Sequence, residues 1–211
     1  PDPNLTTDNN IVAAPHHYFE SIGNLPITIE SGYNTLKSAA GNYQAALFIG
    51  EWGYFGNPAT DVTKVKRFGV VEDANFGSSA WWQWCQAPGD PHGISWDGNS
   101  YSPTSLHLIE LDQSGNFTGN VNQSFLKVLS RTHPIAITGK PTLLTSNSDN
   151  GTMHFEATTD KDGITEIWIP AGFGNPVFTG TNVSVKELKT VEGGFYAYVS
   201  VTGSYTIDIS F

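Results

Sequence analysis

The sequence predicts an α/β region in residues 1–134, followed by an all-β region in residues 135–211. Up to about residue 86, short apolar segments that resemble buried strands alternate with segments of helical periodicity, which is the order of a parallel sheet with crossover helices. From Ile135 onward the hydrophobic pattern changes to a period of two, and Asp162-Gly163 and Gly193-Gly194 mark turns. We therefore expect a parallel sheet covered by helices, and then a small β-sandwich.

The first predicted strand, Ile11–Phe19, ends in polar residues. Because side chains of a strand alternate between its two faces, His16 and Tyr18 should share one face, and His17 should lie on the other. A helix is expected next, from about Ile27 to Tyr43, since apolar residues recur there at steps of three and four.

The second predicted strand is the apolar run Ala45–Ile49, which is followed by Gly50-Glu51-Trp52-Gly53. An unbroken apolar run is typical of a strand that helices cover on both faces. Glu51 then lies at the C-terminal end of the strand, where catalytic groups of barrel enzymes gather and where burying a carboxylate costs free energy of desolvation. The alternative is an ordinary surface acid at the end of a strand.

A second helix is predicted over Asp61–Glu72, and a third strand over Ser78–Gln86. Alternation along this strand puts Trp82 and Trp84 on one side and turns Trp81 outward toward the helices. A tryptophan-rich strand can simply fill a core. Together, however, the three strand ends supply histidine and tyrosine, a glutamate and tryptophans, which suits a site that cleaves sugars: the carboxylate attacks, the phenol orients it and an indole stacks on the sugar ring.

Composition narrows the classes of partner. The formal net charge is -10, so nucleic acids and anionic membrane surfaces are poor partners, whereas neutral sugars fit. Charged residues are only 14% and aromatic residues 12% of the chain, a profile common among extracellular carbohydrate-active proteins, and we expect a secreted protein. Cys85 is the single cysteine and no metal-ligand spacing follows the histidines, so we expect no metal site.

The three strand ends resemble a known family. Pro15-His16-His17-Tyr18, Ile49-Gly50-Glu51-Trp52-Gly53 and Trp81-Trp82-Gln83-Trp84 are similar to the ends of the sixth, seventh and eighth strands in family-5 glycoside hydrolases of clan A. That family consists of (β/α)8 barrels that are retaining glycosidases. The segment from Arg131 to Pro141 further resembles the boundary between the barrel and the β-domain of endoglycoceramidases and related glycosylceramidases.

The resemblance implies roles for individual residues. Glu51 corresponds to the nucleophile, His16 and Tyr18 to the pair beside it, and Trp84, or less readily Trp82, to the tryptophan that stacks on the sugar. It also implies that the substrate is a glycosphingolipid, cleaved between glycan and ceramide, and that no cofactor is required.

One departure from the family is equally informative. The family's acid/base glutamate follows an asparagine at the end of the fourth strand, and no Asn-Glu pair occurs in this sequence. We therefore expect this chain to be the C-terminal part of the barrel, strands six to eight, because three strands cannot close a barrel without leaving open edges. The remaining strands and the acid/base would lie on a companion N-terminal polypeptide of the same enzyme.

Several alternatives stay open at this point. The substrate could be glucosylceramide or a steryl glucoside, or the chain could be a non-catalytic glycan- or lipid-binding protein. Tyr54, Phe55 and Trp96 are candidates for an apolar surface that contacts the lipid. In the all-β region, aromatic residues could form a sugar platform, although a structural appendage with buried rings is the simpler interpretation.

Overall fold

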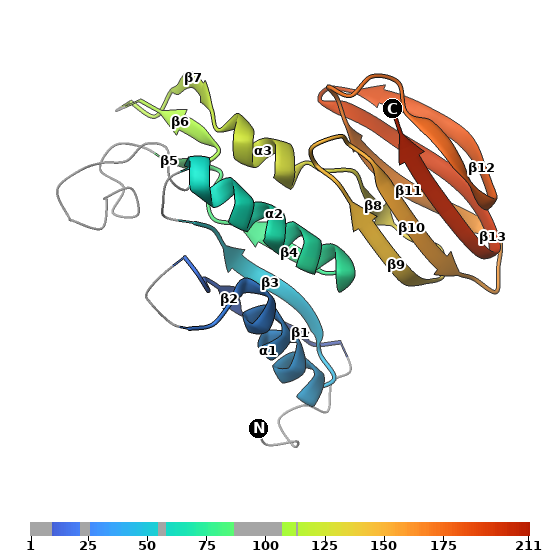
Figure 1. The fold of residues 1–211 in the computed structure, drawn as a ribbon, viewed down its shortest axis with the longest axis horizontal. Helices are drawn as coiled ribbons and strands as arrows, with labels where there is room; N and C mark the ends of the chain where they lie inside the picture. The colour runs from blue at the N-terminus through green and yellow to red at the C-terminus, as the bar shows by residue number, and fades with distance from the viewer. Residues whose placement is uncertain (1–9, 22–25, 55–57, 87–106, 113) are drawn as a thin grey trace. The chain divides into compact units, whose positions relative to one another are not determined.

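The computed structural model of the chain describes residues 10–21, 26–54, 58–86, 107–112 and 114–211 (Figure 1). Two compact units are present. The first comprises Pro1–Glu72 and Gly77–Leu126, and the second comprises Asp73–Phe76 and Lys127–Phe211. The domain boundary at residue 134 stays a prediction, and the compact units divide slightly before it.

The first unit contains parallel strands and two long helices. Strands β1 and β2 both pair with one edge of β3, and β4 pairs with the other, all in the parallel sense. This is the arrangement of part of a (β/α)8 barrel, as the sequence predicted. The elements are β1 (Val12–Ala13), β2 (His16–His17), α1 (Ile29–Asn42), β3 (Ala46–Trp52), α2 (Pro58–Ala74) and β4 (Ser78–Trp81).

Two of the predicted strands are interrupted. The first separates into β1 and β2 around Ala14 and Pro15, since proline has no N–H to donate to a sheet. The third ends at Trp81, and the chain then enters a small separate sheet made of β5 (Cys85–Gln86), β6 (Ile109–Leu111) and β7 (Phe117–Val121). Helix α3 (Gln123–Leu129) follows.

Local sequence explains where the helices begin. At the start of α1, the Thr28 hydroxyl accepts a hydrogen bond from Ser31 N, and the Ser31 hydroxyl accepts one from Thr28 N, which forms a capping box. Helix α2 starts with Pro58, a residue that suits the first turn of a helix because the N–H it lacks would have no partner there.

Aromatic rings join β3 and β4 to the helices. Trp52 stacks on Phe68 of α2 with ring centroids 3.6 Å apart, and Trp81 meets the edge of Trp52 at 4.8 Å. Trp81 also contacts Phe125 of α3 at 5.3 Å, so it faces the helices as predicted. Stacked and edge-to-face pairs of this kind contribute stability beyond the area they bury.

The second unit contains one antiparallel sheet of six strands, in the order β8-β11-β13-β10-β9, with β12 beside β13. The two-sheet sandwich predicted from the sequence is not confirmed, because hydrogen bonding is continuous through β13: its first half pairs with β11 and its second half with β10. The strands are β8 (His133–Ala136), β9 (Lys140–Ser146), β10 (Met153–Thr158), β11 (Gly163–Pro170), β12 (Val177–Val191) and β13 (Gly194–Ser210).

Both halves of this sheet enclose a single core. The buried cluster takes residues from β9, β10, β11 and β13. Tyr205 lies in the half of β13 that pairs with β10. Its hydroxyl is 2.9 Å from the Thr165 hydroxyl of β11, and it donates a hydrogen bond to Thr138 O at 2.7 Å. The buried hydroxyl groups thereby satisfy one another, as buried polar groups must.

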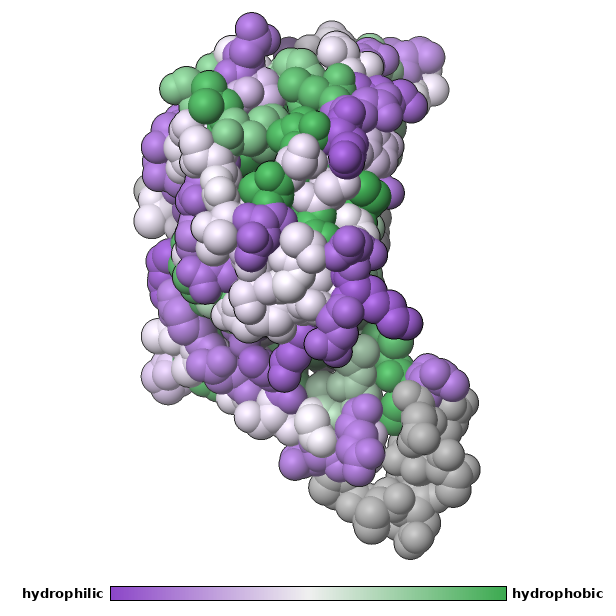
Figure 2. Space-filling view, turned by 90° about the vertical axis from the view of Figure 1, so that its right-hand side faces the viewer, coloured by the Kyte–Doolittle hydropathy of each residue, from purple (hydrophilic) through white to green (hydrophobic). Residues whose placement is uncertain are grey.

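Strand β12 forms an outer border of the sheet. Within the described part of the chain it pairs with β13 alone, and Val177, Val185 and Leu188 on it are exposed. Figure 2 shows apolar side chains interspersed with polar ones on the face of the second unit that is turned toward the viewer. The charged Lys186 and Lys189 also lie on β12, and lysines on a border strand discourage pairing with other chains.

The second unit also contains a buried ion pair between Arg131 and Asp73. Arg131 Nη2 donates to Asp73 Oδ1 at 2.6 Å, Nε donates to the same oxygen at 3.1 Å, and the Ser146 hydroxyl donates to Oδ2. Both charged residues are almost fully buried. Breaking such a pair from one side leaves a buried charge without compensation.

We expect Arg131→Met to lower the free energy of unfolding by about 3–5 kcal/mol, because Asp73 stays buried without its counter-ion. Urea denaturation of the purified protein measures this loss. Lys127→Met is the control: its ammonium reaches Asp149 O in an exposed contact and lies 5.5 Å from the centroid of the Phe173 ring, so its loss should change stability by no more than about 1 kcal/mol. Equal, small effects of both substitutions would contradict the prediction.

His17 lies on the face of β2 opposite to that of His16, as alternation predicted. It is buried, its ring meets Phe19 and Phe68 edge-on at 5.0 and 5.1 Å, and Nε2 lies 3.0 Å from Ile29 O. Burial lowers the pKa of His17 below its usual 6.5, although the hydrogen bond to Ile29 partly opposes the shift. His17 is therefore a neutral core residue.

We expect His17→Gln to weaken the dependence of stability on pH between about pH 7.5 and pH 5. At the upper limit His17 is neutral in the folded and unfolded chain alike. Below about pH 6.5 the unfolded chain takes up the proton more readily than the folded chain, so stability decreases as the pH is lowered, by at most about 1.4 kcal/mol per pH unit. Urea denaturation at a series of pH values measures the slope in both proteins.

The difference in stability between the wild-type protein and His17→Gln at each pH reports the contribution of His17 alone. His154 acts in the opposite sense, because hydrogen bonds to Asp208 and Glu156 raise its pKa, but it contributes equally to both proteins. Identical slopes for the two proteins would show that His17 takes up its proton equally well in the folded state.

Candidate active site

Glu51 lies at the C-terminal end of β3, directly opposite His16 of β2 in the parallel register. The Tyr18 hydroxyl donates to Glu51 Oε1 at 2.5 Å, and His16 Nδ1 lies 2.9 Å from Oε2. Both oxygens of the carboxylate thus have a partner from the neighbouring strand end. The structure therefore brings together three of the residues that the sequence singled out.

The site is only partly open. The side chain of Glu51 is 23% exposed, while that of His16 is 59% exposed. Burial raises the pKa of the Tyr18 hydroxyl, and its hydrogen bond to Glu51 and the charge of that carboxylate raise it further. The phenol therefore keeps its proton at neutral pH and donates a hydrogen bond to the Glu51 carboxylate.

A β-bulge presents Glu51 to its partners. From the pair Ala13–Leu47 to the pair His16–Glu51, β3 advances by one residue more than the facing chain of β1 and β2. On its other edge, β3 also contains one residue more than β4 does between Ile49 and Trp52. A bulge bends a strand and redirects the side chain it carries.

Gly50 makes this bulge possible, and the sequence analysis did not identify it. Gly50 N donates to Pro15 O at 2.9 Å, and a Cβ at position 50 would stand only 3.0 Å from Ala14 O. A glycine inside a strand often marks a bulge or a close approach of two backbones, so this signal was present in the sequence. The close approach of the Gly50 backbone to Ala14 and Pro15 therefore keeps the ends of β2 and β3 together beside Glu51.

Trp82 and Trp84 follow β4 rather than belonging to it, so the prediction from alternation that they share one side of a strand is wrong. Trp82 N donates to Trp52 O at 2.7 Å, which ties its backbone to the residue after Glu51. The Trp84 carbonyl accepts hydrogen bonds from Leu108 N and Ile109 N, and the Trp84 side chain is 60% exposed. That either tryptophan stacks on a sugar stays a prediction.

Tyr54 does not form part of an apolar surface. It is 2% exposed, and its ring meets the edge of Trp52 at 6.3 Å, because the chain turns inward after β3. The part of that prediction that concerns Tyr54 is therefore wrong. Phe55 and Trp96 lie outside the described residues.

Among the described residues, no three histidine, cysteine, aspartate or glutamate side chains are grouped so that they could hold a metal ion. In the same residues, no helix has both the length and the apolar character needed to span a membrane.

The chain is similar to solved structures of glycosidases. Neither a protein-family model nor a curated protein matches the chain. Among solved structures, an endogalactoceramidase is 32% identical to it, with a TM-score of 0.81, over 98% of this chain and 43% of that one. The chain thus spans less than half the length of that relative.

Two further structures share the fold. The lactosyl-enzyme intermediate of endoglycoceramidase II from Rhodococcus sp. is 14% identical, with a TM-score of 0.59, over 86% of this chain and 37% of that one. Sterylglucosidase 1 from Cryptococcus neoformans is 14% identical, with a TM-score of 0.59, over 86% of this chain and 31% of that one. The resemblance to glycosylceramidases that was predicted from the sequence is confirmed.

We expect Gly50→Ala to destabilise the first unit by about 1–3 kcal/mol, because a methyl group must displace the Ala14 carbonyl and with it the strand end that bears His16. Urea denaturation measures the loss, and a crystal structure should show a longer distance between His16 Nδ1 and Glu51 Oε2. Gly41→Ala is the control: open space surrounds that helical position, so a gain of about 0.5–1 kcal/mol is expected. Unchanged stability of Gly50→Ala would contradict this account of the bulge.

Proposed function

We propose that this chain, which is related to endogalactoceramidase along nearly its whole length, carries the nucleophile of a retaining glycoside hydrolase, and that Glu51 is this nucleophile. The observation that carries the proposal is the pair of contacts that hold the Glu51 carboxylate at the C-terminal edge of a parallel sheet. Catalytic groups of barrel enzymes lie at that edge.

The substrate class proposed is the glycosphingolipids, with cleavage of the bond between glycan and ceramide. The identity to endogalactoceramidase, 32%, is more than twice the 14% identity to endoglycoceramidase II and to sterylglucosidase 1, and this favours a ceramide-linked substrate. Glucosylceramide or a steryl glucoside is the second candidate, because the sterylglucosidase shares the fold with a TM-score of 0.59.

Retention of configuration needs two carboxyl groups about 5–5.5 Å apart. In the first step Glu51 attacks the anomeric carbon, the bond from that carbon to the leaving oxygen breaks, and the acid/base protonates this oxygen. In the second step, water that the acid/base deprotonates cleaves the glycosyl ester and frees Glu51. An enzyme-bound lactosyl group in endoglycoceramidase II supports this two-step scheme.

Tyr18 and His16 prepare Glu51 for the attack. Glu51 Oε1 accepts a hydrogen bond from Tyr18, and Oε2 lies 2.9 Å from His16 Nδ1. Each carboxylate oxygen has more than one lone pair, so one oxygen can still reach the sugar. The contacts also fix the orientation of the carboxylate, which is the group that attacks the sugar. We favour Trp82 over Trp84 as the stacking residue, because its backbone is tied to the residue after Glu51.

The acid/base glutamate is proposed to lie on a companion N-terminal polypeptide that completes the barrel. Within the described residues, β1, β2 and β4 pair with β3 alone, so their outer borders have room for further strands. Coverage of 43% of the related endogalactoceramidase is in line with this proposal. Secretion into the extracellular space is proposed on composition alone.

We expect Glu51→Gln to reduce sugar release by at least roughly 10³-fold while substrate binding is retained, since an amide cannot form the glycosyl ester. The assay uses the purified active protein, a panel of glycosylceramides and a steryl glucoside, with release measured by chromatography. Glu187→Gln, on the exposed border strand β12, is the control and should leave release unchanged.

The pattern of release identifies the substrate. Intact glycan freed from galactosyl- or lactosylceramide supports the ceramide-linked class, whereas release from the steryl glucoside alone supports the second candidate. A fluorosugar that is trapped on the peptide containing Glu51 would identify the nucleophile directly. Full release by Glu51→Gln, or binding without any release by the wild-type protein, would refute the proposed function.

A further inference from the structure

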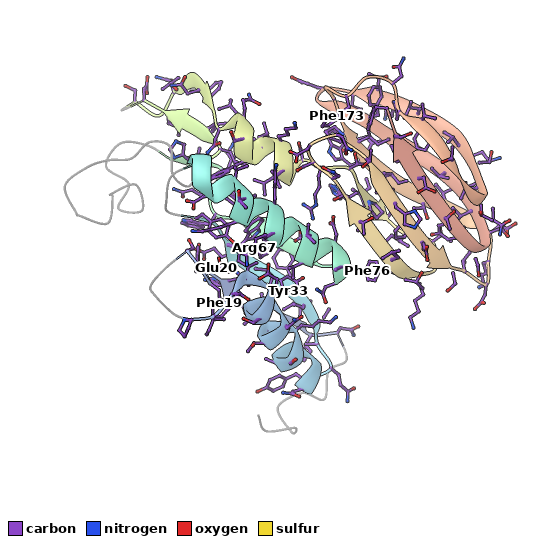
Figure 3. All side chains as sticks on the ribbon, in the orientation of Figure 1. Phe19, Glu20, Tyr33, Arg67, Phe76 and Phe173 are labelled. Carbon is purple, nitrogen blue, oxygen red and sulfur yellow. The ribbon has the colours of Figure 1, made fainter. Side chains whose placement is uncertain are left out.

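Phe19 and Glu20, which follow Tyr18, are both held by the helices of the first unit (Figure 3). The ring of Phe19 lies over Gly32 of α1, where a Cβ would stand 2.1 Å from Phe19 Cδ2. The same ring meets His17 edge-on at 5.0 Å. The residue after Tyr18 is thus wedged between the sheet and α1.

Glu20 is held even more firmly. Arg67 of α2 donates from Nη1 to Glu20 Oε2 and from Nη2 to Oε1, each at 2.9 Å. Ile29 N donates to Glu20 Oε1 at 3.0 Å, and Lys64 Nζ donates to the Glu20 carbonyl at 3.0 Å. Glu20 itself has a φ of 61°, a left-handed conformation that a residue with a side chain keeps only when its surroundings hold it there.

Arg67 also binds Glu30, which offers an internal comparison. Arg67 Nε donates to Glu30 Oε1 at 2.8 Å and Nη2 donates to Oε2 at 2.6 Å. Hydrogen bonds from Arg67 lower the pKa of Glu20 and bring that of Glu30 to about 2, so both carboxylates are ionised at neutral pH. Glu30 lies in the first turn of α1, whereas Glu20 lies two residues after Tyr18.

We propose that Glu20 and Arg67 are positioning residues for the reaction: Arg67 fixes Glu20, Glu20 fixes the turn after β2, and this turn fixes the Tyr18 hydroxyl on Glu51. The turn is closed by Ser21 N, which donates to Tyr18 O at 3.0 Å, so the backbone of Tyr18 moves with that of Glu20. This inference rests on the proposed function of Glu51.

The geometry explains why such a device is useful. Tyr18 reaches Glu51 from the neighbouring strand end through a single contact of 2.5 Å. A displacement of about 1 Å in a positioned catalytic group can reduce the rate about 100-fold. Anchoring the backbone on both α1 and α2 limits such displacement without placing a charged residue in the site itself.

The test is a double-mutant cycle on kcat in the active protein, in which this chain is joined by the strands proposed to complete the barrel. We expect Tyr18→Phe to lower kcat about 100-fold and Glu20→Gln about 10-fold with little change in KM. If Glu20 acts through Tyr18, the double variant should be no slower than Tyr18→Phe alone. Glu30→Gln removes a comparable contact with Arg67 and should leave kcat within about twofold of the wild-type value.

Arg67→Lys provides a second route, because lysine keeps the charge but cannot hold Glu20 with two parallel hydrogen bonds. It should behave as Glu20→Gln does, including the absence of a further effect in Tyr18→Phe, and it replaces Glu20→Gln if that variant does not fold. Multiplicative effects on kcat, or equal losses from Glu20→Gln and Glu30→Gln, would overturn the inference. Turnover that survives Glu51→Gln would instead refute the proposed function, so the two failures are distinguishable.

Discussion

The parallel register between β2 and β3 is the constraint on which the site depends, because it sets the end of one strand beside the carboxylate of the next. A shift of one residue would turn Glu51 toward the opposite face of the sheet, away from Tyr18. Gly50 secures the register by letting two backbones approach closely where a side chain would separate them. The bulge therefore has two effects: it leaves little room for a Cβ at residue 50, and it directs the Glu51 carboxylate toward its partners.

Sequence reasoning succeeded where burial dictates the pattern. The apolar run before Glu51 correctly predicted the strand β3, and the face shared by His16 and Tyr18 follows from the period of a strand. Reasoning failed where a strand stops or bends. Nothing in Trp81-Trp82-Gln83-Trp84 announces that β4 ends at its first residue, and the alternating segments after Ile135 do not reveal that β13 serves both halves of one sheet.

In the first unit, the titratable residues of the core and those of the site have different environments. The buried His17 is neutral and holds α1 through Ile29, whereas its neighbour His16 is largely exposed and faces the carboxylate. Arg67 neutralises two glutamates on the helix side, beyond the strand ends. Among the described residues, Glu20 and Glu30 are thus paired with a cation, whereas the Glu51 carboxylate contacts Tyr18 and His16.

Strand β13 has a consequence for how the second unit forms. Its 17 residues pair with β12 along nearly their whole length and with β11 and β10 in turn, so the pair β8–β11 and the pair β9–β10 are joined into one sheet only when β13 is in place. Folding must wait for pairings between residues far apart in sequence, which slows it relative to assembly from local contacts. The unit should consequently fold and unfold as one cooperative body, with no stable half on the way.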